Sequence, residues 1–188
     1  MGAFYLKLFF KRGTERLDNV PDSFLDMSFE DNESQTLTMR DVAQNHKLYL
    51  VVNIARHSVI GKHNFLKLQQ LYGKYGKRGL IIMAFPTNQF FSNKKEKEVD
   101  IAKQLNDKYC VRFPIYKRID VNGKNTAPLY KYLRTKSRLF DKKKQRAKKV
   151  PWNFTKFLVD FAGTVVKVYN PLDAFEDIER DIGEYLDN

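Results

Sequence analysis

Few side chains in this sequence are candidates for nucleophilic or metal chemistry. Ser58 directly follows His57, so a catalytic serine–histidine pair is one interpretation, but a helix N-cap is favoured because neighbouring side chains usually diverge. The single cysteine, Cys110, excludes an internal disulfide and is expected to be a small buried hydrophobe, with a redox role as the alternative. Neither His46 nor His63 adds metal-ligand spacing on one helix face, so no metal or cofactor is expected.

A basic segment, residues 136–149, is the other candidate for function. It carries eight lysines and arginines against one acidic residue, Asp141, and so holds +7 of the chain's net charge of +12. A solvated charged loop is the plain interpretation, and docking to an acidic surface is the functional one. Phe140 is the only aromatic residue in the segment, which disfavours base stacking. The candidate binding residues are Lys142, Lys143, Lys144, Arg146, Lys148 and Lys149.

Three classes of partner fit such a segment. An acidic protein lattice, such as a microtubule wall, and the phosphates of RNA would both attract it through charge. Anionic lipid head groups are a further but less favoured candidate. Electrostatic docking is favoured in each case over recognition of bases.

The length of 188 residues suffices for one domain with a sizeable core, and no apolar run reaches the roughly 20 residues of a membrane span. Residues 1–22 are interpreted as an N-terminal extension and residues 23–188 as the domain. The apolar start at residues 4–10 is short and has no small-residue cleavage site after it, so a packed extension is favoured over a secretory signal. A single cysteine suits an intracellular, reducing compartment.

Apolar runs alternate with helical periodicity along the chain. We predict buried strands at residues 47–55 and 80–85, a further strand at 113–120, and hairpins at 28–37 and 157–169. Helices are predicted around residues 65–75, 96–108, 128–134 and 175–186. This order indicates an α/β fold with a mixed central sheet and helices on both faces.

Five segments resemble the glutathione peroxidase family, in the family's order and at roughly its spacing. They are VVNIA at 51–55, GLIIMAFPTNQF at 79–90, FPIYKRIDVNG at 113–123, PLYKYL at 128–133 and WNFTKFLVD at 152–160. The resemblance covers about residues 24 to 187 and implies a thioredoxin-like fold. It lacks the tetramer-forming insertion of some members, so a monomer is expected.

The resemblance also implies a set of site positions. Ser58 stands where the family has its reactive cysteine or selenocysteine, and Asn93 stands where it has a glutamine. Trp152 and Asn153 match the family's tryptophan and asparagine, although core packing and a turn are favoured as their roles here. A serine hydroxyl is a weak nucleophile and has no sulfenic acid form. Arg56 and Val59 also stand where the family usually has small residues, and these losses beside the missing thiol indicate natural decay of the site.

A resolving cysteine, present in many cysteine-type members, would fall at Asn106 by spacing from the 113–123 segment. The prediction is a catalytically degraded glutathione-peroxidase-like protein. It would be a structural or interaction component of a larger assembly, held through the basic segment and the N-terminal extension. The alternative is a thiol-dependent hydroperoxide peroxidase, acting on lipid or other hydroperoxides with a nonstandard nucleophile. Glutathione or thioredoxin would be partners only under that alternative.

Overall fold

The computed structural model describes residues 13–90 and 101–187. Its centre is a four-stranded sheet in which β4 and β5 are parallel and the other neighbours are antiparallel. Both parallel strands are buried along their whole length, as their continuous apolar runs predicted. The strand order is β5 (Leu80–Pro86), β4 (Leu48–Ile54), β8 (Lys156–Asp160) and β9 (Val165–Tyr169).

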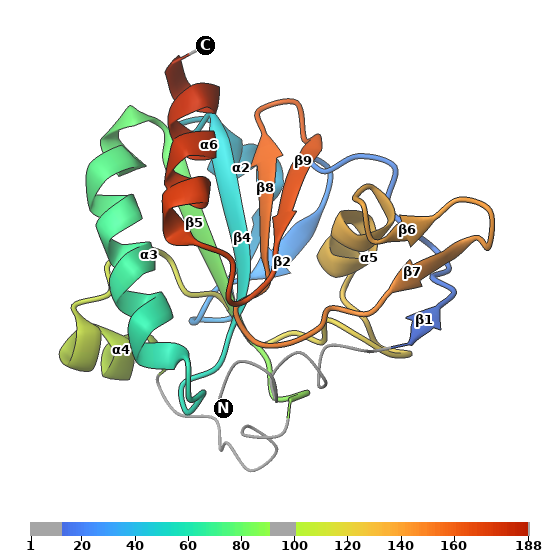
Figure 1. The fold of residues 1–188 in the computed structure, drawn as a ribbon, viewed down its shortest axis with the longest axis horizontal. Coiled ribbons are helices and arrows are strands. Elements are labelled where there is room, and N and C mark those ends of the chain that lie inside the picture. The colour runs from blue at the N-terminus through green and yellow to red at the C-terminus, as the bar shows by residue number, and fades with distance from the viewer. Residues whose placement is uncertain (1–12, 91–100, 188) are drawn as a thin grey trace.

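Helices cover both faces of this sheet (Figure 1). Alternate residues of β4 divide between two apolar cores, with Leu50 in one and Val51 in the other. The first core includes side chains of α3 (Gly61–Tyr75), α4 (Ile101–Tyr109) and α6 (Phe175–Asp187). The second includes side chains of α2 (Met39–Ala43) and α5 (Pro128–Thr135). The predicted mixed sheet with helices on both faces is confirmed.

The local predictions hold at several boundaries. The hairpin of β2 (Ser28–Glu30) and β3 (Thr36–Thr38) is present, and α3 ends where Gly76 begins the short helix η1 (Gly76–Arg78). Gly79 then adopts a φ of 111°, which glycine reaches without strain. Helix α4 begins at Ile101 in the described part, and the rest of its predicted range, residues 96–100, lies outside it.

The strand predicted at residues 113–120 is wrong. The chain there runs beside β5, where Ile115 forms a single bridge to Ala84. Pro114 has no N–H to donate, which interrupts a regular ladder. Three backbone hydrogen bonds remain between this segment and β5: Ala84 N to Pro114 O, Tyr116 N to Ala84 O and Ile119 N to Pro86 O, at 3.1, 2.9 and 3.0 Å.

A second, small sheet joins the start of the described chain to the basic segment. β6 (Phe140–Asp141) and β7 (Arg146–Lys148) form an antiparallel hairpin, and β1 (Thr14–Glu15) pairs with β7. Figure 1 shows this sheet at the opposite side of the molecule from α3 and α4. The basic segment is therefore a short hairpin rather than an irregular loop. Part of the N-terminal extension is its third strand.

Candidate functional site at the end of strand β4

Ser58 lies in the turn that connects β4 to α3. Its backbone N–H donates to Ala55 O at 3.3 Å, and Gly61 N–H donates to Ser58 O at 2.8 Å. The N-cap prediction is wrong, because the cap position falls on Ile60, which makes no side-chain cap bond. The Ser58 hydroxyl is instead buried, with 8% of the residue exposed, and has no hydrogen-bond partner among the described residues.

Trp152 and Asn153 reach the same end of β4 through a tight turn. Asn53, a β4 residue, donates from Nδ2 to Trp152 O at 3.1 Å and accepts at its backbone O from Phe154 N–H at 2.6 Å. Phe154 has a φ of 64°, an uncommon conformation for a bulky residue, and these bonds hold it there. The fold thus brings three of the four predicted site positions to one end of the sheet.

The surroundings of these side chains are largely packed. Asn153 is fully buried, and the ring of Trp152 lies 5.4 Å from that of Phe90, between centroids. The fourth predicted position, Asn93, lies outside the described residues.

A buried amine follows this turn, and sequence reasoning did not find it. Lys156 is fully buried at the start of β8, where its Nζ donates to Phe154 O at 2.8 Å. Nζ also lies 4.9 Å from the ring centroid of Phe175. Burial lowers the pKa of Lys156 to about 7, against a smaller opposing influence from Asp173. The available signal was the continuous apolar run at 157–159, which predicts a strand buried on both faces directly after position 156.

No basic side chain among the described residues is hydrogen-bonded to the Ser58 hydroxyl. His57 is exposed, while Nδ1 of His46 bonds to the Val42 carbonyl at 2.7 Å and the ring of His63 packs against Phe175. Serine needs an adjacent, oriented base to act as a nucleophile. In this part of the chain the turn therefore offers a buried hydroxyl without the partner that would activate it.

Cys110 directly follows α4, and the expectation of a buried small hydrophobe is wrong. Its side chain is exposed, and its backbone adopts a φ of 54° with the N–H donating to Asn106 O at 2.8 Å. The chain turns here so that the next residue, Val111, enters the core instead. The side chain of Asn106 donates to Val111 O at 3.1 Å and so stabilises this turn.

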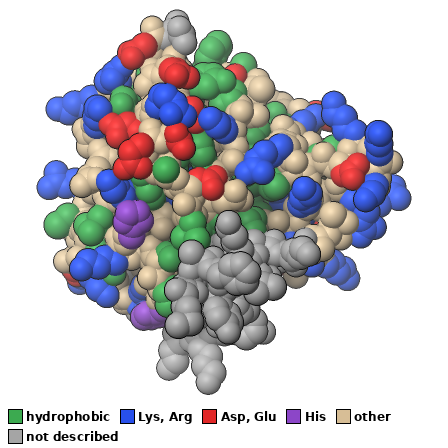
Figure 2. Space-filling view, in the orientation of Figure 1, with side chains coloured by type: hydrophobic (Ala, Val, Ile, Leu, Met, Phe, Trp, Pro, Cys, Tyr) green, Lys and Arg blue, Asp and Glu red, His purple; other side chains and the backbone are tan. Residues whose placement is uncertain are grey.

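The basic segment presents its cations in two ways. Lys142, Lys143 and Lys144 are exposed in the β6–β7 turn, where backbone N–H groups of the last two bond to Asp141 Oδ1 at 3.0 and 3.1 Å. Lys148 is also exposed, on the other side of β7 from buried Ala147. Figure 2 shows blue side chains gathered at this side of the molecule.

The remaining two predicted binding cations contact β1. Arg146 donates to Thr14 from Nε to Oγ1 and from Nη2 to the carbonyl O, both at 2.9 Å. Lys149 Nζ lies 3.5 Å from Oε2 of Glu15. The structure therefore separates four outward lysines from two cations that help to bind the N-terminal strand.

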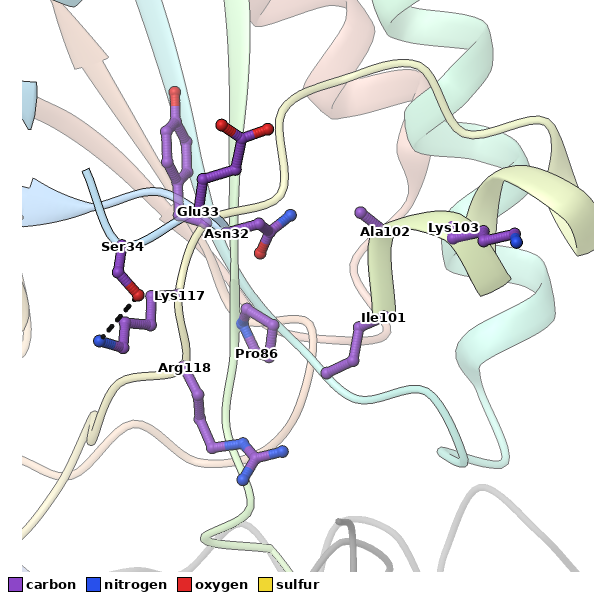
Figure 3. Close-up of a pocket in the computed structure, with 10 residues that line it drawn as sticks. Asn32, Glu33, Ser34, Pro86, Ile101, Ala102, Lys103, Lys117 and Arg118 are labelled. Atoms are coloured by element: carbon purple, nitrogen blue, oxygen red, sulfur yellow. Dashed lines mark hydrogen bonds between the residues drawn. The ribbon is translucent and has the colours of Figure 1, made fainter. Parts of the chain in front are cut away.

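A cavity of about 630 Å³ lies elsewhere on the molecule (Figure 3). It is bounded by the β2–β3 turn, the end of β5, the start of α4 and residues 116–118, and none of Ser58, Trp152 or Asn153 lines it. Lys117 pairs with Glu30, whereas Nε of Arg118 is buried without a hydrogen-bond partner in the described chain. Sequence reasoning missed this cavity because its walls come from four distant segments.

Two features are absent from residues 13–90 and 101–187. No helix in these ranges is long and apolar enough to cross a membrane. The same ranges contain no group of three or more histidine, cysteine or acidic side chains that could hold a metal ion.

Solved structures identify the class of fold. A thiol:disulfide interchange protein of the thioredoxin family from Chlorobium tepidum TLS aligns with a TM-score of 0.58, at 15% identity, over 90% of this chain and 99% of its own. GPX1 of T. cruzi aligns with a TM-score of 0.65, at 30% identity, over 89% and 98%. The fold is thioredoxin-like.

Sequence relatives identify the family. The glutathione peroxidase family model matches residues 24–134. A probable phospholipid hydroperoxide glutathione peroxidase of Citrus sinensis is 41% identical over 142 residues, which cover 75% of this chain and 81% of that protein. Probable glutathione peroxidase 2 of Arabidopsis thaliana is 36% identical over 165 residues, covering 88% and 94%. This chain belongs to the glutathione peroxidase family.

Proposed function

We propose that this family member has lost thiol peroxidase chemistry at the β4–α3 turn and acts as a binding component of a larger assembly. The observation that carries the proposal is Ser58, a buried hydroxyl at the position where the family resemblance places a reactive cysteine or selenocysteine. A thiol peroxidase attacks the peroxide O–O bond with a thiolate and becomes a sulfenic acid. Serine supplies neither the thiolate nor the oxidised form.

Binding is proposed to use the basic segment against an acidic macromolecular surface. The support is the exposure of Lys142, Lys143, Lys144 and Lys148 on a hairpin that is fixed by its pairing with β1. A fixed hairpin loses less conformational freedom on binding than an irregular loop would. An intracellular, reducing compartment and a monomeric chain belong to the same proposal.

The chemical half is tested with purified protein. Turnover of hydrogen peroxide and of a phospholipid hydroperoxide is measured with glutathione and with thioredoxin, alongside Ser58→Ala and Ser58→Cys. We expect the wild-type protein and Ser58→Ala to be equally inactive. Activity gained by Ser58→Cys would show that the Trp152–Asn153 turn still supports a thiol. Wild-type turnover that Ser58→Ala abolishes would refute the proposal.

The binding half is tested in the native cell. Affinity purification with mass spectrometry at low and high salt is compared between wild type and a variant with Lys142, Lys143, Lys144 and Lys148 changed to Gln. We expect the variant to lose association and salt dependence, because salt screens exposed charges. The control carries the same four changes at exposed lysines elsewhere: Lys47, Lys62, Lys77 and Lys124. Equal association of both variants would contradict the basic segment as the contact.

A second candidate function rests on the exposure of Cys110. Its thiolate could attack a hydroperoxide, releasing the alcohol and forming a sulfenic acid that two glutathione molecules reduce to thiol, water and glutathione disulfide. Relatives named as probable phospholipid hydroperoxide glutathione peroxidases make lipid hydroperoxides the substrate to try first. Turnover that persists in Ser58→Ala and is lost in Cys110→Ser would establish this candidate.

A further inference from the structure

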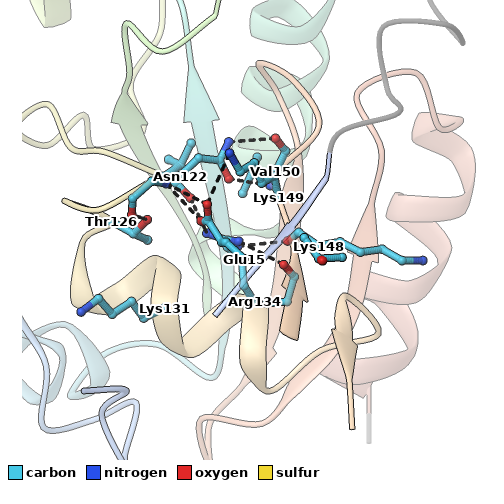
Figure 4. A network of polar contacts seen from close by, with 12 residues as sticks. Glu15, Asn122, Thr126, Lys131, Arg134, Lys148, Lys149 and Val150 are labelled. Carbon is cyan, nitrogen blue, oxygen red and sulfur yellow. Dashed lines mark hydrogen bonds and ion pairs between the residues drawn. The ribbon is translucent and has the colours of Figure 1, made fainter. Parts of the chain in front are cut away.

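The carboxylate of Glu15, on β1, is held by three separate donors (Figure 4). Arg134 Nη1 lies 2.5 Å from Oε1, and Gly123 N–H donates at 3.0 Å to Oε1 and 3.3 Å to Oε2. Lys149 Nζ completes the set at 3.5 Å from Oε2. We call Gly123, Arg134 and Lys149 the carboxylate clamp.

Arg134 is also held by bonds that do not involve Glu15. Arg134 is fully buried, and its other N–H groups donate to carbonyls of Lys148, Ala147 and Val121 at 3.1, 3.4 and 3.2 Å. A buried guanidinium that is oriented in this way has one direction left for an anion. Burial raises the pKa of Glu15, but the bonds to Arg134 and Gly123 and the charge of Lys149 outweigh it, and the pKa is lowered.

The strand that delivers the carboxylate is recognised mainly through its backbone. Thr14 pairs with Lys148 and Glu15 with Ala147, so the register sets the glutamate above the clamp. Lys149 N–H donates to Gly13 O at 3.2 Å, and Arg146 bonds to the carbonyl of Thr14. Apart from the Thr14 hydroxyl, which accepts from Arg146, these contacts would form with any extended segment that places an acidic residue at this register.

We infer that β7 and the carboxylate clamp are a docking site for an extended acidic segment of a partner protein, and that β1 occupies it until the partner displaces it. This inference rests on the proposed binding function and specifies its partner. β1, the edge strand that the partner would displace, pairs with β7 through two residues. The chain that follows β1 is exposed at Arg16, Asp18 and Asn19. The exposed lysines of the β6–β7 turn would attract an acidic segment toward the clamp.

The geometry favours a protein partner over RNA. Arg134 is fully buried, so an anion reaches it only on a side chain that projects from a strand paired with β7. A nucleic acid backbone has no alternating N–H and C=O groups to form that pairing. The partner must also compete with β1, which has a high effective concentration because it belongs to the same chain. Pairing over more residues than the two of β1 would favour the partner, and Glu15→Gln weakens the competitor.

The test compares full-length wild-type protein with Glu15→Gln. The probe is a fluorescently labelled peptide with the sequence of residues 13–20, and the matched control peptide has Gln in place of its glutamate. Loss of a hydrogen bond to a charged group weakens binding by about tenfold or more. We therefore expect Glu15→Gln to bind the glutamate peptide at least about tenfold more tightly than it binds the control peptide, and more tightly than wild type does.

Equal affinity of Glu15→Gln for the two peptides would overturn the carboxylate clamp as a docking site. A labelled single-stranded RNA is titrated in parallel, and a gain as large as that of the peptide would overturn selectivity for an acidic strand. Adding Arg134→Met to Glu15→Gln should abolish the preference for the glutamate peptide over the control peptide. If that double variant does not fold, the comparison of the two peptides on Glu15→Gln alone still tests the carboxylate clamp. Failure of the four-lysine variant to weaken native association would contradict the proposed function alone.

Discussion

Replacing Lys156 with methionine tests the account of the β4 end most directly. The Lys156 amine is fully buried, with one hydrogen bond to Phe154 O and the Phe175 ring nearby. Burial lowers its pKa from 10.5 to about 7 in the folded protein. Methionine has a similar length and no charge, so it removes the cost of burying the amine while it still fills the space.

The sign of the pH dependence follows from the direction of this shift. Between pH 7 and 10.5 the unfolded chain holds the proton more tightly than the folded protein, so wild-type stability rises with pH in that window. At pH 7 the cost of burying Lys156 is about 4 kcal/mol, and by pH 9.5 it falls to about 1 kcal/mol. Methionine leaves the buried Phe154 carbonyl without this donor, which costs about 2 kcal/mol at either pH, whereas the Phe175 ring attracts the amine only while the amine is charged.

Lys156→Met should therefore be more stable than wild type by about 1–2 kcal/mol at pH 7 and less stable by about 1 kcal/mol at pH 9.5. Urea unfolding at the two pH values, followed by circular dichroism, measures the difference. Lys62→Met, at an exposed position of α3, is the control and should show no such change with pH. A stability difference between Lys156→Met and wild type that stays the same at both pH values would refute the reasoning.

Two further changes probe packing and charge elsewhere. Gly163→Ala should destabilise the protein by about 2 kcal/mol more than Gly123→Ala in thermal melts, because both glycines have a φ of 86° but only the first new Cβ would lie 2.6 Å from Phe24 Cβ. If the two variants lost equal stability, backbone strain at the positive φ alone would account for the destabilisation. Glu15→Gln should lose about 2–4 kcal/mol at pH 7, because it leaves Arg134 buried without its counter-charge. Since the folded pKa of Glu15 is lowered, its contribution is lost as pH falls below 4.5 through that pKa, so urea unfolding at pH 3 should show a smaller difference than at pH 7.

The elements that the sequence predicted well are those whose burial is uniform. β4 and β5 are continuous apolar runs inside the sheet, and α6 has apolar residues at helical spacing, so pattern and environment agree. Residues 113–120 begin with an apolar run, but Pro114 and a single bridge to β5 leave them outside the sheet. The short helix α2 was not predicted, although Thr38 and Asp41 form the reciprocal capping bonds that mark its start.

Contacts between distant segments could not be predicted from local pattern. Nothing in residues 13–16 indicates that Glu15 is held by Arg134, more than a hundred positions away. The roles of Ser58 and Cys110 were misjudged for a related reason. A shift of two residues in the start of α3 removes the cap, and a left-handed turn after α4 places the cysteine outside the core.

The residues that make the family recognisable at the β4 end also have roles in folding. The Trp152 carbonyl and the Phe154 N–H bond to Asn53, Thr155 Oγ1 donates to the same carbonyl at 2.9 Å, and Lys156 binds the Phe154 carbonyl. Each of these bonds helps to hold a turn whose central residue has a left-handed backbone. Such a segment would be retained for stability even if the nucleophile were lost, because breaking any of the bonds leaves a buried polar group unpaired. Family membership at this turn is therefore compatible with the absence of peroxide chemistry, and the Ser58 variants separate the two.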